Sequence, residues 1–297
     1  MKIRIGYGLG TRTLTNQPET FEPFVDHLEE LGFDSLWLSE RITGEAPDPL
    51  IALAYAAART TRLKFGTSVL VVPGRNPVVL AKELATLDRL SGGRLLPAVG
   101  LGVADPFEQQ AFGVARGERA RIFDEALPLL RRLWTEDAVD HDGEFFHLEG
   151  MTVQPKPVQQ PIDVWLGGLA PSELRRVGRL GDGWLPSFAT ADEVRDGIAA
   201  VQAAAAEHGR TIDPEHFGAL IAYRDGPLPD LVAQFVRRRR PDVDPTQVIP
   251  ERAQVVDAIK RMIDIGASKF VLIPIGEPTD WRDELRYMAD VALPLEN

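Results

Sequence analysis

The stretch from residue 63 to residue 102 has the pattern of a complete strand–helix–strand unit, and it limits the chain to folds built on parallel strands. Residues 65–72 form an apolar, β-rich run that is typical of a parallel strand buried on both faces. Asn76 and Pro77 then provide an N-cap and a first helical position, and a second apolar run follows at residues 95–99. A unit of this kind makes a right-handed crossover and, when it is repeated, a parallel sheet.

The rest of the chain repeats this alternation of strand and helix patterns. The predicted strands are residues 3–8, 34–39, 65–72, 95–99, 162–167, 183–185, 217–222 and 269–275. Eight such units in 297 residues predict an α/β fold, a (β/α)₈ TIM barrel, which typically needs ~250 residues. The remaining length predicts insertions after strands four and seven, including a hairpin with a two-residue turn at Asp142-Gly143. Since no linker divides the chain, we expect residues 1–297 to form a single domain.

The carboxyl ends of the strands are where such barrels place their active sites. Glu40 follows the second strand, where it could act as a general acid or base or simply pair with Arg41. Gly100 and Gly102 end the fourth strand, and their missing side chains would let a flat ligand lie against the backbone. The glycine-rich loop at residues 167–172 joins a strand to a helix, so its free N–H groups suit a phosphate, although a turn needed only for packing is the alternative.

Composition excludes several other classes of function. The formal net charge of −11 argues against a nucleic-acid partner, and the absence of cysteine excludes disulfides and thiol chemistry. The five histidines have no metal-binding spacing, so we expect no metal site. A serine hydrolase is weakly supported, because the segment 66–70 lacks the closing glycine of a nucleophile elbow. With no apolar run approaching ~18 residues and no apolar signal-peptide core, we expect a cytoplasmic protein that does not bind membranes.

Five segments together resemble the luciferase-like family of flavin- and deazaflavin-dependent oxidoreductases. They read DSLWLSER, LKFGTSVLVVPGRNPVVLAKELATLDRLSGGR, VGLGVADPFEQQAFG, PKPVQQPIDVWLGG and LRRVGRLGDGWLP. The longest is similar to the actinobacterial branch that uses coenzyme F420, a 5-deazaflavin, while FMN-using relatives share much of the pattern. The resemblance therefore implies a (β/α)₈ barrel that binds F420, with FMN as the alternative.

The resemblance also implies which residues contact the cofactor. In the family a non-prolyl cis peptide backs the ring, and the matching bond is Ser68-Val69. The family's phosphate loop matches residues 167–170, where Leu169-Ala170 replace a frequent hydroxyl residue, so Ser172 or backbone amides would serve. The full predicted set is Ser39, Ser68, Val69, Gly100, Gly102, Gly167, Gly168, Leu169, Ala170 and Ser172.

Two departures from the family pattern bear on the substrate. Relatives of the sugar-phosphate dehydrogenase carry Asp-His after strand two and a glutamate after the Gly-x-Gly of strand four, where this chain has Ser39-Glu40 and Val103. This argues against glucose 6-phosphate and leaves Glu40 as the expected catalytic proton donor. We expect hydride transfer between F420 and a small organic substrate; the alternatives are an FMN-dependent monooxygenase or reductase and a non-catalytic flavin-binding protein. The resemblance further implies a homodimer, and the small residues Ala52, Ala56 and Ala57 would allow close helix packing.

Overall fold

The computed structural model describes residues 1–11 and 16–297. The chain forms two compact units. The first unit contains residues 1–9, 27–37 and 166–297, and the second contains residues 10–26 and 38–165. The expectation of a single domain over residues 1–297 stays a prediction.

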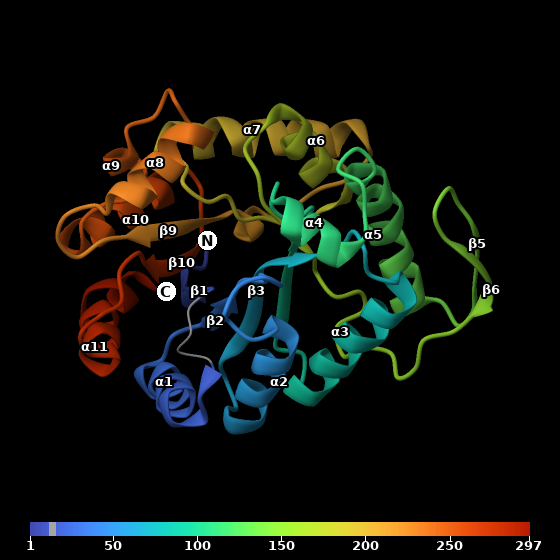
Figure 1. The fold of residues 1–297 in the computed structure, drawn as a ribbon, viewed down its shortest axis with the longest axis horizontal. Helices are drawn as coiled ribbons and strands as arrows, with labels where there is room; N and C mark the ends of the chain where they lie inside the picture. Colours follow the sequence, from blue (N-terminus) through green and yellow to red (C-terminus); the bar gives the residue numbers. More distant parts are fainter. Residues whose placement is uncertain (12–15) are drawn as a thin grey trace. The chain divides into compact units, whose positions relative to one another are not determined.

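The main sheet has eight strands in the order β8-β7-β4-β3-β2-β1-β10-β9 (Figure 1). The pairs β1–β10, β10–β9 and β3–β4 are parallel, and parallel bridges from Trp184 to Phe217 and from Ser187 to Leu220 link the β8 segment to the β9 segment. The two ends of the strand order therefore meet within the first unit, as barrel closure requires. The predicted (β/α)₈ barrel is confirmed. The strands are β1 Arg4–Gly10, β2 Ser35–Leu38, β3 Lys64–Val71, β4 Leu95–Gly100, β7 Trp165–Leu166, β8 Gly183–Trp184, β9 Gly218–Tyr223 and β10 Lys269–Pro274.

Helices follow the strands as the apolar periodicity predicts. The helix α3 begins after Asn76, whose side chain accepts hydrogen bonds from the N–H groups of Val78 and Val79, and ends at Gly92 in the left-handed conformation (φ +70°). Residues next to the two ends of α3 determine where the helix begins and ends, and both ends lie where the sequence predicts them. The helices between strands are α1 Pro18–Leu31, α2 Pro49–Arg59, α3 Pro77–Ser91, α5 Arg119–Thr135, α6 Pro171–Leu180, α7 Ala191–Glu207, α10 Val255–Asp264 and α11 Trp281–Ala292.

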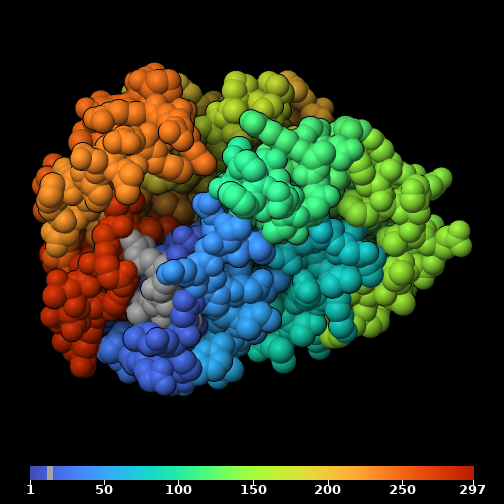
Figure 2. Space-filling view, viewed as in Figure 1, coloured from blue at the N-terminus to red at the C-terminus, as the bar shows by residue number. Residues whose placement is uncertain are grey.

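The insertion after β4 contains α4 (Pro106–Phe112) and a hairpin that projects beyond the helices of its unit (Figures 1 and 2). The hairpin pairs β5 (Val139–Asp142) with β6 (His147–Met151) in antiparallel fashion. The expected two-residue turn is wrong, because residues 143–146 form a four-residue loop. The Glu125 carboxylate of α5 accepts hydrogen bonds from the N–H groups of Phe145 and Phe146, and this anchor holds the longer loop.

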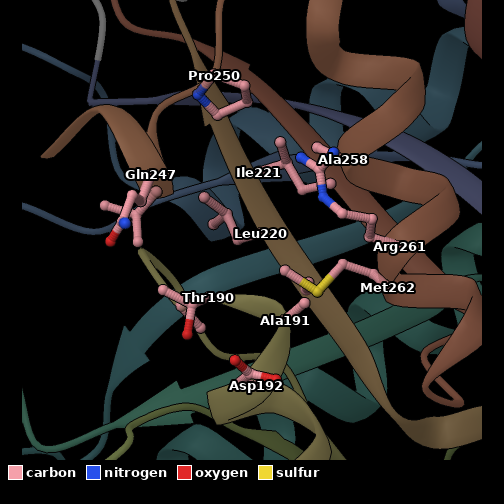
Figure 3. Close-up of a pocket in the computed structure, with 13 residues that line it drawn as sticks. Thr190, Ala191, Asp192, Leu220, Ile221, Gln247, Pro250, Ala258, Arg261 and Met262 are labelled. Carbon is pink, nitrogen blue, oxygen red and sulfur yellow. The ribbon is translucent and has the colours of Figure 1, made fainter. Parts of the chain in front are cut away.

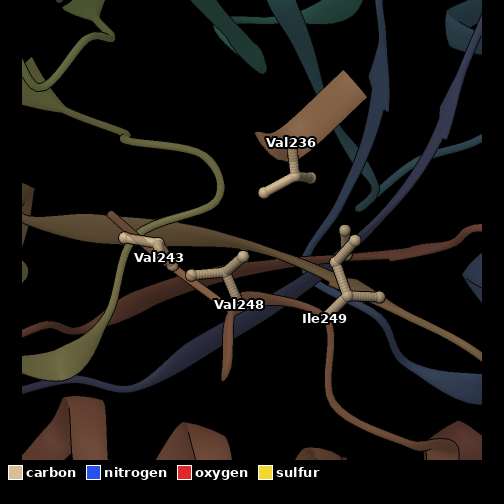
Figure 4. Close-up of a cluster of buried hydrophobic side chains, with 5 residues drawn as sticks. Val236, Val243, Val248 and Ile249 are labelled. Atoms are coloured by element: carbon tan, nitrogen blue, oxygen red, sulfur yellow. The ribbon is translucent and has the colours of Figure 1, made fainter. Parts of the chain in front are cut away.

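The insertion after β9 contains α8 (Asp230–Arg239) and α9 (Pro245–Val248). Its side chains form a small apolar cluster with a residue of β9 in the first unit, shown in Figure 4. The buried members are Ala222, Val236, Val243, Val248 and Ile249. Both predicted insertions are confirmed. Among the helices of the described residues, none combines the length and the apolar character that crossing a bilayer requires.

Candidate functional site

The ends of β2, β3 and β4 meet within the second unit and bring several predicted site residues together. The hydroxyl of Ser39 donates a hydrogen bond to the carbonyl oxygen of Ser68 at 2.8 Å, and the two hydroxyls lie 3.2 Å apart. The N–H of Val72 donates to the carbonyl oxygen of Gly100 at 3.2 Å. The segment after β2 is thus tied to β3, and β3 is tied to the end of β4.

The middle of β3 carries a bulge at the predicted position. The Ser68-Val69 peptide bond is cis, which confirms the expectation from the family resemblance. The register between β3 and β4 shifts between Ser68 and Leu70, so the regular ladder is interrupted there. Ser68 and Val69 are half-buried, whereas Thr67 and Leu70 on either side are fully buried.

The glycines at the end of β4 are required by this bulge. A Cβ atom at Gly100 would lie 2.8 Å from Cγ2 of Val69, closer than real Cβ contacts allow. Gly102 has φ +78°, and a Cβ there would lie 3.1 Å from Cγ1 of Val71. The backbone must stay bare at both positions for the side chains of β3 to pack. The predicted contact of these glycines with a flat ring stays a prediction.

Glu40 is buried at this bulge and is bound on both oxygens. Its side chain is 1% exposed and forms an ion pair with Arg75. Its Oε2 accepts a hydrogen bond from the N–H of Val71 at 2.7 Å. The alternative that Glu40 pairs with Arg41 is wrong, because Arg41 turns instead to two carboxylates, Asp105 at 3.2 Å and Glu108 at 3.3 Å.

Burial and the charge of Arg75 act in opposite directions on the pKa of Glu40. Burial raises the pKa of Glu40, while the hydrogen bond from Val71 and the charge of Arg75 act against that rise. Arg75 also lies 3.8 Å from the carboxylate of Asp48 and 4.0 Å from that of Glu83. Burial raises the pKa of Glu83 as well. One guanidinium is therefore shared by three carboxylates.

Two further charged side chains hold the loops beside the bulge. Glu108 of α4 accepts hydrogen bonds from the N–H groups of Ile42 and Thr43 at 3.2 and 2.8 Å. Burial alone would raise the pKa of Glu108, but the bonds from Thr43 and Ile42 and the charge of Arg41 together lower it. Arg119 donates to the carbonyl oxygens of residues 101, 102 and 103 at 3.1, 3.2 and 3.0 Å.

Arg75, Glu108 and Arg119 are residues of this site that were not predicted from the sequence. The sequence did contain a signal for Arg75. This residue follows the end of the third predicted strand, and the acidic residue Glu40 follows the end of the neighbouring second strand. Because such ends lie at the same edge of a parallel sheet, a buried ion pair between them was a reasonable alternative to the pair with Arg41. Arg119 binds backbone carbonyl oxygens, and Glu108 binds two backbone N–H groups in addition to Arg41; such backbone partners leave no trace in the sequence.

The glycine-rich loop lies in the first unit, between β7 and α6, and its N–H groups are partly occupied. Leu169 and Ala170 both donate their N–H groups to Oε2 of Glu173, each at 2.9 Å. The expectation of free N–H groups is therefore wrong at these two residues. The reason is local: a glutamate at the third helical position folds back over the helix start, as in a capping box. Gly168 (φ +99°) must be glycine, because a Cβ there would lie 2.5 Å from the same carboxylate.

Comparison with known families decides the identity of this chain at the family level. Residues 3–224 match the model of the luciferase-like monooxygenases. The chain belongs to the luciferase-like monooxygenase family. The sequence resemblance is thus confirmed.

Among relatives of this luciferase-like protein, an F420-dependent glucose-6-phosphate dehydrogenase from Kineococcus radiotolerans is 33% identical over 193 residues. That match covers 62% of this chain and 56% of the relative, so the chain spans about half the length of such curated relatives. Two solved structures share the fold. A monooxygenase, RslO1 from Streptomyces bottropensis, has a TM-score of 0.78 at 24% identity and covers 98% of this chain and 99% of its own. An F420-dependent secondary alcohol dehydrogenase in complex with an F420–acetone adduct has a TM-score of 0.82 at 20% identity and covers 100% of both chains.

The first unit of this luciferase-like protein also contains a cavity of about 490 Å³, a size that suits a small ligand (Figure 3). Strand β9 and helix α10 provide its apolar wall, with Ile221 and Met262, and the start of α7 and the β9 insertion add the polar Thr190 and Gln247. The predicted site residues do not line this cavity. Its lining residues form no recognisable sequence motif.

The predicted dimer face of the luciferase-like protein needs one correction. Ala52, Ala56 and Ala57 are 6%, 0% and 5% exposed, so they pack inside the chain and cannot meet a partner. The exposed large apolar side chains of α2 and α3 are instead Ile51, Tyr55, Val79 and Leu90, at 71%, 42%, 55% and 73%. Within residues 1–11 and 16–297, no group of three or more histidine or acidic side chains is arranged to hold a metal ion.

Proposed function

We propose that this protein is an F420-dependent oxidoreductase that transfers a hydride between the deazaflavin and a small organic substrate. The observation that carries the proposal is the bulge at Ser68-Val69, which lies where the family resemblance expects the wall behind the ring. The name of the Kineococcus relative supports F420 rather than another cofactor. When bound, F420 would supply the hydride chemistry, and the protein would supply binding, orientation and electrostatics.

The residues around the bulge fit a planar ring. Ser39, Ser68 and Val69 would lie beside it, and the bare backbone of Gly100 and Gly102 leaves no side chain in the way. Within the second unit, Ser39 is hydrogen-bonded to Ser68, Gly100 lies in close contact with Val69, and Gly102 lies in close contact with Val71 of the same strand. The ring would thus rest on a preorganised surface.

The glycine-rich loop fits the cofactor phosphate less completely. The N–H groups of Leu169 and Ala170 already donate hydrogen bonds to the carboxylate of Glu173. This carboxylate is an anion, and it occupies the place that was expected for the phosphate. We therefore assign the phosphate to the amides of Gly167 and Gly168 and to the exposed hydroxyl of Ser172. Leu169 and Ala170 would join only if the Glu173 side chain moved away.

Glu40 is the proposed catalytic residue, because its carboxyl group binds the backbone of Val71 next to the bulge. Burial favours its protonated form, as a proton donor requires. Replacing it by glutamine removes the proton but keeps the size of the side chain. We expect Glu40→Gln to lower turnover by about 10² to 10⁴-fold, the usual contribution of general acid–base catalysis. Steady-state kinetics and F420 binding, measured on the same variant, separate this effect from loss of the cofactor; unchanged turnover would remove Glu40 from the mechanism.

The substrate is proposed to be a small organic molecule other than glucose 6-phosphate. The Kineococcus relative is named for that sugar phosphate, but this chain has Ser39-Glu40 and Val103 at positions where the dehydrogenase pattern is Asp-His and glutamate. A change of ionisable groups at three positions alters what the site can protonate and bind. Turnover of glucose 6-phosphate at a rate comparable to other substrates would contradict this assignment.

The cofactor is tested by titrating the protein with F420 and, separately, with FMN while following tryptophan fluorescence. Trp184 is a suitable reporter, because its Nε1–H donates to the carbonyl oxygen of Gly168 at 2.9 Å in the glycine-rich loop. We expect micromolar or tighter binding of F420 and weak binding of FMN, and Trp184→Phe should remove most of the signal. The reverse preference would support the FMN-dependent monooxygenase or reductase, which the RslO1 neighbour represents. Binding of F420 without turnover on broad substrate panels would support the non-catalytic alternative.

A homodimer through α2 and α3 is also proposed, on the exposed apolar side chains Ile51, Tyr55 and Val79. Sedimentation should give a dimer for the natural chain and a monomer for Ile51→Asp combined with Val79→Asp. Leu231→Asp is the matched control, because Leu231 is a similarly exposed apolar residue on α8, at 81%. A natural chain that sediments as a monomer would rule out this interface.

A further inference from the structure

The ion pair between Arg75 and Glu40 binds both backbone polar groups of one residue in β3. Glu40 accepts a hydrogen bond from the N–H of Val71 at 2.7 Å, and Nε of Arg75 donates to the carbonyl oxygen of Val71 at 3.0 Å. The N–H of Glu40 donates in turn to the carbonyl oxygen of Val69 at 3.2 Å. The side chains of Glu40 and Arg75 thus provide the hydrogen-bond partners of the backbone next to the bulge, where the register between β3 and β4 shifts.

We propose that Arg75 is a positioning residue of this site: it holds Glu40 and the backbone of Val71 in one arrangement and thereby fixes the bulge at Ser68-Val69. The geometry requires a guanidinium, which can bind a carboxylate and a carbonyl oxygen from one planar group. The relevance of the bulge to F420 rests on the proposed function, but the ion pair and its hydrogen bonds do not.

Arg75 also affects the protonation of the acidic residues at the site, because its guanidinium faces carboxylates from three segments. Glu40 follows β2, Asp48 caps α2 and Glu83 lies in α3, and their side chains are 1%, 39% and 44% exposed. Without Arg75, these carboxylates would face one another without the shared cation. Glu40, the most deeply buried of the three, would take up a proton first. The titration of Glu40 therefore reports whether the ion pair is intact, and the affinity for F420 reports whether the site depends on it.

The test compares Arg75→Met and Arg75→Lys with a matched control, Arg94→Met. Arg94 is likewise a partly buried arginine of the second unit that binds backbone carbonyls, but it lies at the opposite ends of β3 and β4. Three measurements are made on each variant: the dissociation constant of F420 between pH 5 and pH 9, hydrogen exchange of the Val71 amide without cofactor, and the carboxyl titration of Glu40 by NMR without cofactor, assigned with Glu40→Gln.

For Arg75→Met we expect F420 to bind about tenfold more weakly or worse, as when one partner of a buried charge pair is truncated. The Val71 amide should exchange faster, and Glu40 should titrate at a higher pH than in the natural chain. Arg75→Lys keeps the charge without the planar donors, so it should restore the titration of Glu40 but not the affinity or the slow exchange. Arg94→Met should lower the melting temperature and leave the F420 affinity and the titration of Glu40 unchanged, and it should speed exchange of the Val71 amide no more than that of other buried strand amides.

The proposal is overturned if a folded Arg75→Met keeps the natural affinity, exchange and titration. If Arg75→Met fails to fold, Arg75→Lys decides, because natural affinity together with slow exchange of Val71 in that variant contradicts a role for the guanidinium. If the natural chain does not bind F420 at all, the proposed function fails. Hydrogen exchange and the titration of Glu40 still test Arg75 in that case, and unchanged values in both variants overturn its role.

Discussion

The two ends of the β3–β4 pair are each organised by an arginine, but the two arginines have different partners. At the amino ends, Arg94 donates to uncharged oxygen atoms and its guanidinium lies over the ring of Phe65, 4.9 Å from the centroid. Those acceptors are the carbonyl oxygens of Ala57, Thr60, Leu63 and Ser91 and the hydroxyl of Thr60. At the carboxyl ends, Arg75 binds one carbonyl oxygen and is shared by three carboxylates.

This difference separates a stabilising cross-link from a site that can change its charge. Neutral oxygen atoms do not titrate, so these hydrogen bonds of Arg94 do not depend on the protonation of their acceptors. Carboxylates held at partial burial have shifted pKa values, which is the usual property of functional sites. The contrast agrees with the general division of a (β/α)₈ barrel into a stability face at the amino ends of the strands and an active face at the carboxyl ends.

The largest expected effect is the loss of stability when Arg94 is replaced by methionine. Several carbonyl oxygens that are now bound to a charged donor would lose their partner, and bonds to charged groups contribute about 1.5–3 kcal/mol each. We expect Arg94→Met to lower the free energy of unfolding by about 3 kcal/mol in urea denaturation. Arg238→Met, a change at an exposed arginine of α8, is the control and should stay within about 0.5 kcal/mol. A loss below about 1 kcal/mol would show that Arg94 does not stabilise the amino ends.

A smaller loss of stability is expected when Gly100 is replaced by alanine at the opposite end of β4. The new Cβ atom would lie 2.8 Å from Cγ2 of Val69. Overpacking of this kind costs about 1–3 kcal/mol, and adding Val69→Ala should recover most of the loss by removing the clashing methyl groups. Gly117→Ala is the matched control, because a Cβ there meets no atom within 4 Å. Equal stability of Gly100→Ala and the control would contradict the close packing of the bulge.

The smallest effect is a difference in the pH dependence of stability between two carboxylates near the carboxyl ends. The pKa of Glu108 is lowered in the folded state, so its contribution is present above the unfolded pKa and is lost as pH falls through the folded pKa. The pKa of Glu40 is raised, so its contribution is full below the unfolded pKa and is lost as pH rises through the folded pKa.

Urea denaturation across this range should therefore give opposite results for two matched variants. Glu108→Gln should reduce the loss of stability on acidification, whereas Glu40→Gln should reduce the loss on raising the pH above the unfolded pKa of about 4.3. If both variants change the pH profile in the same direction, the two carboxylates do not have opposite shifts, and the comparison between the two environments fails.

The features that could be predicted from the sequence are those that depend on local patterns. The eight strands follow from apolar runs, and the ends of α3 follow from Asn76, Pro77 and Gly92. The bulge at Ser68-Val69 was predicted from the family resemblance, since no local pattern reveals a cis peptide bond. The helix start over residues 169–173 could have been predicted too, because a glutamate at the third helical position is a local signal.

The order of strands and helices, their caps and the family were thus determined by the sequence by itself, because hydrophobic periodicity and capping act between residues a few positions apart. Only the tertiary structure decided the partners of the charged groups. Glu40 has its neighbour Arg41 in sequence but pairs with Arg75, 35 positions away, and Arg94 reaches carbonyl oxygens up to 37 positions away. Buried ions take whichever partner the packed backbone brings within reach, since desolvation makes an unpaired charge costly and sequence separation does not enter.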